Sequence, residues 1–218
     1  MAKRVGVILS GCGVYDGSEI HEAVLTMLFL DQAGAKIVSM APNMEQLHVI
    51  DHSNQTRTAE KRNVLVESAR IARGEIKDIR DMKAADLDAV IIPGGFGAAK
   101  NLSDFAVSGR NAEVHPEVAR LLNEMAGSSK PIGAICIAPA TLTRALSDKK
   151  PEVTIGNDMD TAAAIEAMGG KHVVRSVEEV HIDRANKIVT TPAYMIGPGI
   201  KDVAKGIEKL VSEVLALA

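Results

Sequence analysis

Short apolar runs alternate along the chain with longer segments in which apolar residues recur at helical spacing. Central runs such as Ala89–Ile92 are apolar throughout, which is typical of strands covered on both faces. This alternation predicts βαβ units and therefore an α/β fold with a mainly parallel sheet and helices on both faces. The predicted strands are Arg4–Ser10, Ala35–Ala41, Asp88–Pro93, Pro131–Cys136, Val153–Ile155 and a late hairpin of Glu179–Ile182 with Lys187–Thr191.

Helices are predicted between these strands, the first of them from Ser18, as N-cap, to Ala33 before Gly34. The others cover Glu60–Arg73, Glu113–Ala126, Ala138–Leu146, Thr161–Met168 and Lys201–Leu217. Residues 42–85 are too many for a simple connection and carry much charge, so we expect an insertion at the sheet edge. No linker divides the 218 residues, which predicts a single domain over 1–218.

Composition and charge limit the classes of partner that we expect for this chain. Lysine and arginine total 25 against 28 acidic residues, a net charge of −3, and the basic residues are scattered, so we expect no nucleic acid partner. The first apolar run, Val5–Leu9, is too short for a signal peptide or a membrane span, and we expect no membrane partner. Two cysteines form no disulfide or CxxC framework, which favours a cytoplasmic location.

Cys136 is the strongest candidate for a catalytic nucleophile. A buried strand runs into it and a helix of small residues follows directly, with Ala134 and Ala138 as small neighbours, which is the pattern of a nucleophile elbow. We expect the helix N-terminus to lower the pKa of the thiol and the Ile137 N–H to face an oxyanion. The alternative is that Cys136 is a small buried apolar residue.

A second buried strand ends in Pro93-Gly94-Gly95 at the same carboxyl edge of the predicted sheet. The N–H of Gly95 would then lie beside Cys136 as a second oxyanion donor. Taken alone, the same tripeptide is also an ordinary turn at the end of a strand.

The glycine-rich loop Gly11–Ser18 follows the first strand and leads into the first helix. Its spacing is not GxGxxG and no P-loop lysine follows, so we expect no nucleotide. Glu22, one turn into the helix, would face the strand ends and act on the Cys136 thiol as an acid/base group. The alternative is a solvent-facing glutamate stabilised by the helix dipole, which is the interpretation we favour for Glu19.

Three elements together, Glu22, Pro93–Gly95 and Ala134–Cys136, resemble the PfpI superfamily. Further strings resemble its enhancing-lycopene-biosynthesis (ElbB) subfamily, described as glyoxalases: Leu9–Glu22, Gly156–Asp160 and Val189–Tyr194. The resemblance implies a flavodoxin-like three-layer sandwich and a homodimer. It also implies a cofactor-independent conversion of glyoxal or other small dicarbonyls to hydroxy acids, with a small aldehyde as substrate and glycated amines as further substrates.

In that chemistry the Cys136 thiolate attacks the aldehyde to form a hemithioacetal, Glu22 moves protons, and the Gly95 and Ile137 N–H groups stabilise the alkoxide. One departure concerns histidine. Protease-like and amidotransferase-like relatives pair the cysteine with a histidine, whereas Ile137 follows Cys136 here and no His-Pro-Glu string is present. We therefore disfavour glutaminase and peptidase activities.

The remaining pocket residues are expected from loops at the same edge: Val14–Ser18, Asn157–Asp160 and Tyr194–Gly197. The individual candidates are Cys12, Tyr15, Asn157, Asp158 and His181. For His181 a place on the hairpin surface is favoured over a place in the site. Cys12 either forms a regulatory disulfide with Cys136 or is an incidental thiol. The histidines lack metal-ligand spacing, and we predict no metal.

Two other functions stay open at this point. In one of them the protein is a redox-sensing or chaperone-like stress protein, in which Cys136 oxidises to a sulfinate that Glu22 stabilises. A noncatalytic partner in isoprenoid metabolism is the third hypothesis.

Overall fold

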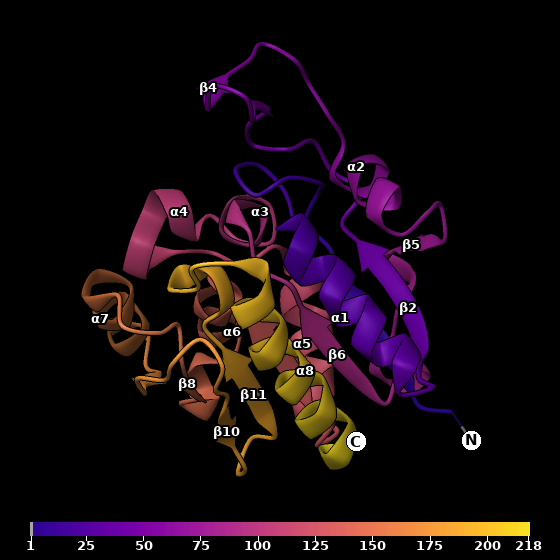
Figure 1. Ribbon diagram of the computed structural model, residues 1–218, viewed down its shortest axis with the longest axis vertical. Helices are drawn as coiled ribbons and strands as arrows, with labels where there is room; N and C mark the ends of the chain where they lie inside the picture. The colour runs from indigo at the N-terminus through magenta and orange to yellow at the C-terminus, as the bar shows by residue number, and fades with distance from the viewer. Residues whose placement is uncertain (1) are drawn as a thin grey trace.

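The computed structural model describes residues 2–218, and a seven-stranded sheet lies at the centre of this part of the chain (Figure 1). Neighbouring strands are parallel except at one end, where the last hairpin adds an antiparallel edge strand. The order across the sheet is β10 (His181–Asp183), β11 (Ile188–Thr191), β7 (Ile132–Ile135), β6 (Ala89–Ile92), β1 (Arg4–Ile8), β2 (Lys36–Ala41) and β5 (Ile76–Asp78).

Helices cover both faces of this sheet. On one face α1 (Ile20–Gln32) and α8 (Ile200–Leu217) lie side by side, as Figure 1 shows, and α2 (Val64–Ile71) packs with them. The opposite face carries α3 (Phe96–Lys100), α5 (Pro116–Gly127) and α6 (Ala138–Ala145). Near its rim lie the short α4 (Phe105–Ser108) and α7 (Met159–Ala167). The predicted α/β, flavodoxin-like sandwich is confirmed.

Strand β6 shows why its sequence is apolar throughout. Val90 and Ile92 contribute to the core beneath α5 and α6, whereas Ala89 and Ile91 contribute to the core beneath α1 and α8. Successive side chains of a strand point to opposite faces, so a strand buried on both sides needs an apolar residue at every position.

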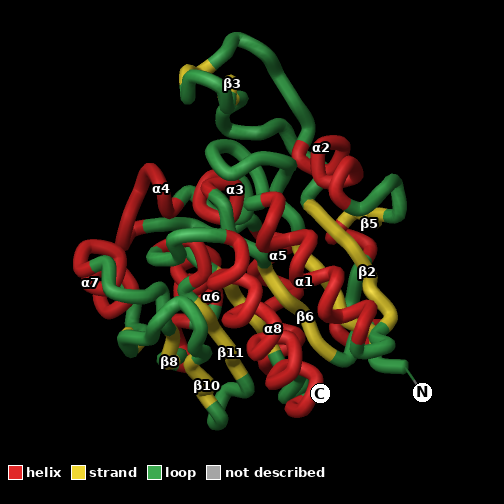
Figure 2. Tube along the Cα trace, viewed as in Figure 1, coloured by secondary structure: helices red, strands yellow, loops and turns green. Residues whose placement is uncertain are grey.

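Residues 42–85 contain a small hairpin, β3 (Ile50–Asp51) with β4 (Thr56–Arg57), which projects from the body of the molecule (Figure 2). The Asp16 carboxylate accepts the Ile50 N–H at 2.7 Å and so ties the hairpin to the glycine-rich loop. The same region supplies α2 and also β5, which pairs in parallel with β2 and was not predicted as a strand.

One predicted strand lies elsewhere than expected. The run Val153–Ile155 does not enter the central sheet; β8 (Glu152–Val153) pairs with β9 (Lys171–His172) in a separate two-stranded sheet. Its backbone is held beside the last hairpin by side chains, since the Glu152 N–H donates to Asp183 and the Thr154 N–H donates to Thr190. Strand β11 instead takes the position next to β7.

The loops that follow β1, β6, β7 and β11 meet at the carboxyl edge of the sheet. Strand order reverses between β1 and β6, and in open α/β sheets such a reversal creates a crevice at that edge. Within residues 2–218 no helix has the length and apolar character needed to cross a bilayer.

Candidate active site

Cys136 lies immediately after β7, on the turn that leads into α6. Its φ is +61°, in the left-handed region that costs a non-glycine residue about 1 kcal/mol or more. Its N–H donates to the Thr191 carbonyl at 2.9 Å, which anchors the turn to β11, and the buried Ala134 and Ala138 leave room for it. This backbone is that of a nucleophile elbow, and strain of this kind is concentrated at functional sites.

Two backbone donors face the sulfur of Cys136. The N–H groups of Gly95 and Ile137 form hydrogen bonds to it, so both residues predicted as oxyanion donors lie at the site. Gly95 has a φ of +90°, and a Cβ there would collide with the Glu19 nitrogen and the Gly17 carbonyl oxygen. Only glycine therefore allows the turn after β6 to approach the glycine-rich loop so closely.

Glu22 reaches the same point from α1 and is completely buried. Its carboxyl accepts the Gly94 N–H at 2.9 Å and the Tyr194 N–H at 3.3 Å, and it is hydrogen-bonded to the Cys136 thiol. Burial, followed by the nearby charge of Glu19, raises the pKa of Glu22 to about 8. Glu22 is therefore mainly protonated at neutral pH and has a proton to give to the sulfur or to a bound substrate.

The prediction that the helix N-terminus lowers the pKa of the Cys136 thiol is wrong. Burial raises the pKa of Cys136 well above its ordinary value, and the charge of Glu22 raises it further. The N–H donors of Gly95 and Ile137 act in the opposite direction but do not outweigh burial. The pair Cys136–Glu22 therefore carries at most one negative charge near neutral pH.

A cavity of about 340 Å³ opens beside Cys136. Most of its wall is apolar or aromatic and comes from five residues on four segments: Val14, Phe96, Ile137, Tyr194 and Met195. Glu19, Asp158 and Thr161 supply its polar lining. A small apolar pocket with a few polar groups beside a reactive side chain is typical of a substrate site.

Glu19 differs from its expected solvent-facing position. Only 9% of the residue is exposed, and its Oε2 accepts the Glu22 N–H at 2.7 Å as the N-cap of α1. It therefore fixes the start of the helix that carries Glu22, besides lining the cavity.

Among the other predicted pocket residues, only Asp158 lines the cavity. Tyr15 stacks against His52, with ring centroids 5.1 Å apart, and Asn157 is exposed to solvent just before α7. His181 lies on the edge strand β10, with its Nε2 3.3 Å from the Glu152 carboxylate. None of these three side chains lines the cavity.

Cys12 is also outside the cavity lining. Both cysteines are free thiols, so the structure holds no Cys12–Cys136 disulfide. Burial, followed by the charge of Glu67 on α2, raises the pKa of the Cys12 thiol. Cys12 is thus influenced by a charge on α2, while Glu19, farther along the chain, lines the cavity beside Cys136.

Residues 12–192 match the DJ-1/PfpI family. The chain belongs to this family. It is 49% identical to the human protein named glutamine amidotransferase-like class 1 domain-containing protein 3, mitochondrial, over 99% of this chain and 84% of that protein. It is 48% identical to the rat ES1 protein homolog, mitochondrial, over 98% of this chain and 84% of that protein.

Among solved structures, it is similar to an isoprenoid biosynthesis protein with an amidotransferase-like domain from Ehrlichia chaffeensis. That similarity covers 99% of both chains, with a TM-score of 0.93 and 40% identity.

This DJ-1/PfpI chain has no histidine at its nucleophile among the contacts that residues 2–218 make. His21 bonds to the Tyr194 hydroxyl at 2.8 Å. The imidazoles of His52, His115, His172 and His181 bond to backbone N–H groups or to the Glu152 carboxylate. No three His, Cys, Asp or Glu side chains in this part of the chain are grouped as a metal site requires. The carboxyl of Glu22 is therefore the titratable partner of the sulfur.

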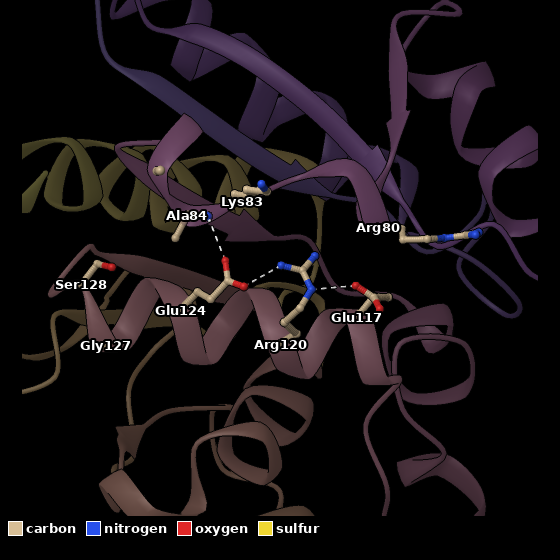
Figure 3. A pocket seen from close by; sticks show the side chains of 9 residues that line it. Arg80, Lys83, Ala84, Glu117, Arg120, Glu124, Gly127 and Ser128 are labelled. Atoms are coloured by element: carbon tan, nitrogen blue, oxygen red, sulfur yellow. Dashed lines mark hydrogen bonds and ion pairs between the residues drawn. The ribbon is translucent and has the colours of Figure 1, made fainter.

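A larger depression, of about 800 Å³, lies along α5 (Figure 3). Its central charges are already paired: Arg120 binds Glu117 at 2.7 Å and Glu124 at 2.8 Å, and Glu124 also accepts the Ala84 N–H. Arg120 further donates to the Ile79 and Met82 carbonyls. These contacts hold α5 against the loop before β6, so we assign the depression a structural role.

Phe96 and Thr161 were not identified from the sequence as lining residues. Phe96 directly follows Gly94-Gly95, and Thr161 is in the first turn of the helix after Asp158. Their adjacency to predicted site segments was the available signal, but which side chain turns inward depends on how α3 and α7 pack.

Proposed function

We propose that this DJ-1/PfpI protein is a cofactor-independent, glyoxalase-type enzyme that converts glyoxal and related small dicarbonyls to hydroxy acids through a Cys136 hemithioacetal. The observation that carries the proposal is the hydrogen-bonded pair of Cys136 and a protonated Glu22 at the wall of a small, mainly apolar cavity. A nucleophile and a proton carrier in contact are the two groups that such an isomerisation needs.

The proposed reaction balances without any oxidant or cofactor. The sulfur of Cys136 bonds to one aldehyde carbon of glyoxal, and its oxygen takes a proton to give the hemithioacetal. Glu22, as carboxylate, removes the hydrogen of that carbon as a proton and returns it to the neighbouring carbon. The hydroxyl proton of the hemithioacetal passes to the neighbouring oxygen, and the product is a thioester whose acyl carbon bears a hydroxymethyl group. Water cleaves the thioester, and glycolic acid and the free thiol result.

The N–H groups of Gly95 and Ile137 support this scheme because they already donate to the sulfur. They stabilise the thiolate before addition, and we expect them to stabilise the oxygen on the attached carbon afterwards. Glu22 suits proton transfer because a pKa of about 8 lets it hold or release a proton near neutral pH.

The test is glyoxal consumption and glycolate formation followed by NMR. Cys136→Ala should abolish turnover, and Glu22→Gln should lower kcat by about 10²-fold or more, because it keeps the shape of the side chain but cannot accept a proton. Cys12→Ala is the matched control, since this thiol lies outside the cavity lining, and it should retain wild-type turnover. Equal turnover in wild type and Cys136→Ala would refute the proposal.

A redox-sensing role is the second candidate, and the protonated carboxyl of Glu22 favours it because this group would donate to a sulfinate oxygen on Cys136. Mild peroxide followed by mass spectrometry tests it, and an unmodified Cys136 would count against it. A noncatalytic role in isoprenoid metabolism draws support only from the name of the Ehrlichia relative.

Location and assembly belong to the same proposal. Two free cysteines favour a reducing compartment, with the cytoplasm as our expectation, although the mammalian relatives are named as mitochondrial proteins. We also propose a homodimer, which size-exclusion chromatography with light scattering would test.

A further inference from the structure

The cavity beside Cys136 combines negative charge with apolar walls. Its two ionisable side chains other than Cys136 and Tyr194 are carboxylates, Glu19 and Asp158. Asp158 is the N-cap of α7, where its Oδ1 accepts the Thr161 N–H at 2.8 Å. Hydrogen bonds from the side chain of Thr161 and from its N–H hold the pKa of the Asp158 carboxyl below its usual range. Asp158 is therefore ionised throughout the neutral range.

Two basic side chains, Lys100 and His21, lie close to this wall and are already hydrogen-bonded. The Nζ of Lys100 donates to the Tyr15 carbonyl at 2.9 Å and lies 5.1 Å from the centroid of the Phe96 ring, and Lys100 is not among the residues that line the cavity. The imidazole of His21 bonds to the Tyr194 hydroxyl and is 4.0 Å from Glu19. No lysine or arginine lines the cavity within residues 2–218.

We infer that Asp158 and Glu19 make this cavity select against anionic electrophiles, so that its substrates are neutral or cationic aldehydes carrying an apolar group. A negative charge on a bound substrate would share the cavity with two carboxylates, one of them the exposed Asp158, and with the charge that forms on the Cys136–Glu22 pair, and like charges repel. A phenyl or alkyl group would pack against Phe96 and Met195. This inference rests on the proposed function for the aldehyde, whereas the charge selection is a property of the cavity itself.

The first experiment compares phenylglyoxal with 4-carboxyphenylglyoxal, which share the reacting group and differ in charge. In wild type we expect kcat/KM to be about tenfold higher for the neutral compound. Asp158→Asn should narrow that ratio several-fold, because asparagine keeps the helix cap and removes the charge. Asp160→Asn makes the same change two residues away, on an exposed side chain outside the cavity lining, and should leave the ratio unchanged. A wild-type ratio near one, or a ratio unaffected by Asp158→Asn, would overturn the inference.

The second experiment does not depend on turnover. The Cys136 thiolate displaces iodide from iodoacetamide or from iodoacetate, forming a thioether in both cases, and the two reagents differ in charge. Rates are measured in a Cys12→Ala background at pH 9 and normalised to those of 2-mercaptoethanol. We expect a normalised preference of about tenfold for the amide, reduced several-fold by Asp158→Asn and not by Asp160→Asn.

Together the two experiments distinguish a failure of the glyoxalase proposal from a failure of the charge selection. Absent aldehyde turnover with retained preference for iodoacetamide would reject the glyoxalase proposal and keep the charge selection. Equal normalised alkylation rates would reject the charge selection, whatever the aldehydes do.

Discussion

The thiol of Cys136 and the carboxyl of Glu22 share a hydrogen bond at a point where Glu22 is completely buried. Burial raises the pKa of both groups, and the charge of Glu22 raises the pKa of Cys136 further, because two adjacent negative charges cannot be solvated there. Glu22 has the lower pKa of the two, at about 8, so the pair exchanges protons with substrate near neutral pH.

The first prediction concerns the titration of the thiol. Glu22→Gln removes the carboxylate that raises the pKa of Cys136, so the pH at which the thiol becomes reactive should fall. The measurement is the rate of iodoacetamide modification of Cys136 between pH 6 and 10. Glu208→Gln changes an exposed glutamate on α8 and should leave the profile unchanged. A profile shifted to higher pH in Glu22→Gln would mean that the Glu22 proton stabilises the thiolate instead.

The second prediction concerns stability against pH. The pKa of Glu22 is about 8 in the folded protein and 4.5 in an unperturbed chain, so between these values the folded state keeps a proton that the unfolded state has lost. Unfolding then releases a proton, and the contribution of Glu22 to the free energy of unfolding falls as pH rises through this window, by up to about 1.4 kcal/mol per pH unit. Wild type should therefore lose stability relative to Glu22→Gln between pH 5 and 8 in urea unfolding. Parallel stability curves for the two proteins would contradict the buried, protonated carboxyl.

The third prediction concerns the close approach of the β6 turn to the elbow. A Cβ at Gly94 would lie 2.5 Å from the Cys136 Cβ, 2.6 Å from Glu22 Oε2 and 2.8 Å from the Ile135 carbonyl oxygen. These atoms are buried or belong to the backbone, so Gly94→Ala should destabilise the fold by about 2 kcal/mol and abolish the reactivity of Cys136. Chemical denaturation and alkylation measure the two effects.

The control for this variant is Gly127→Ala, at the end of α5, where a Cβ would meet nothing within 4 Å. That change should be neutral or stabilise the protein by about 0.5–1 kcal/mol, because alanine favours the helix. A Gly94→Ala variant as stable and reactive as Gly127→Ala would show that the turn and the elbow are not in contact.

The local pattern of apolar residues was sufficient to predict the strands at the centre of the sheet. A run such as Ala89–Ile92 is apolar at every position because both faces of β6 are covered. That requirement concerns consecutive residues, so it can be recognised in the sequence. The late hairpin that forms one edge was also predicted, but the local pattern failed for the other edge strand and for one apolar run. Ile76–Asp78 is too short and polar to be recognised, and becomes strand β5 only because β2 offers a free edge, whereas the apolar Val153–Ile155 is held outside the sheet by Asp183 and Thr190.

For the candidate site, the sequence alone determined which segments meet: the elbow at Cys136, the turn at Gly94-Gly95 and the helix bearing Glu22, because the carboxyl ends of parallel strands share one edge. The tertiary structure decided the pKa values of these groups, and so which of them carries a proton. How deeply a thiol is buried and how near a carboxyl lies are set by the packing of residues distant in sequence, and both determine a pKa. A thiol expected to have a lowered pKa therefore has a raised one, and Glu19, expected in solvent, lines the cavity instead.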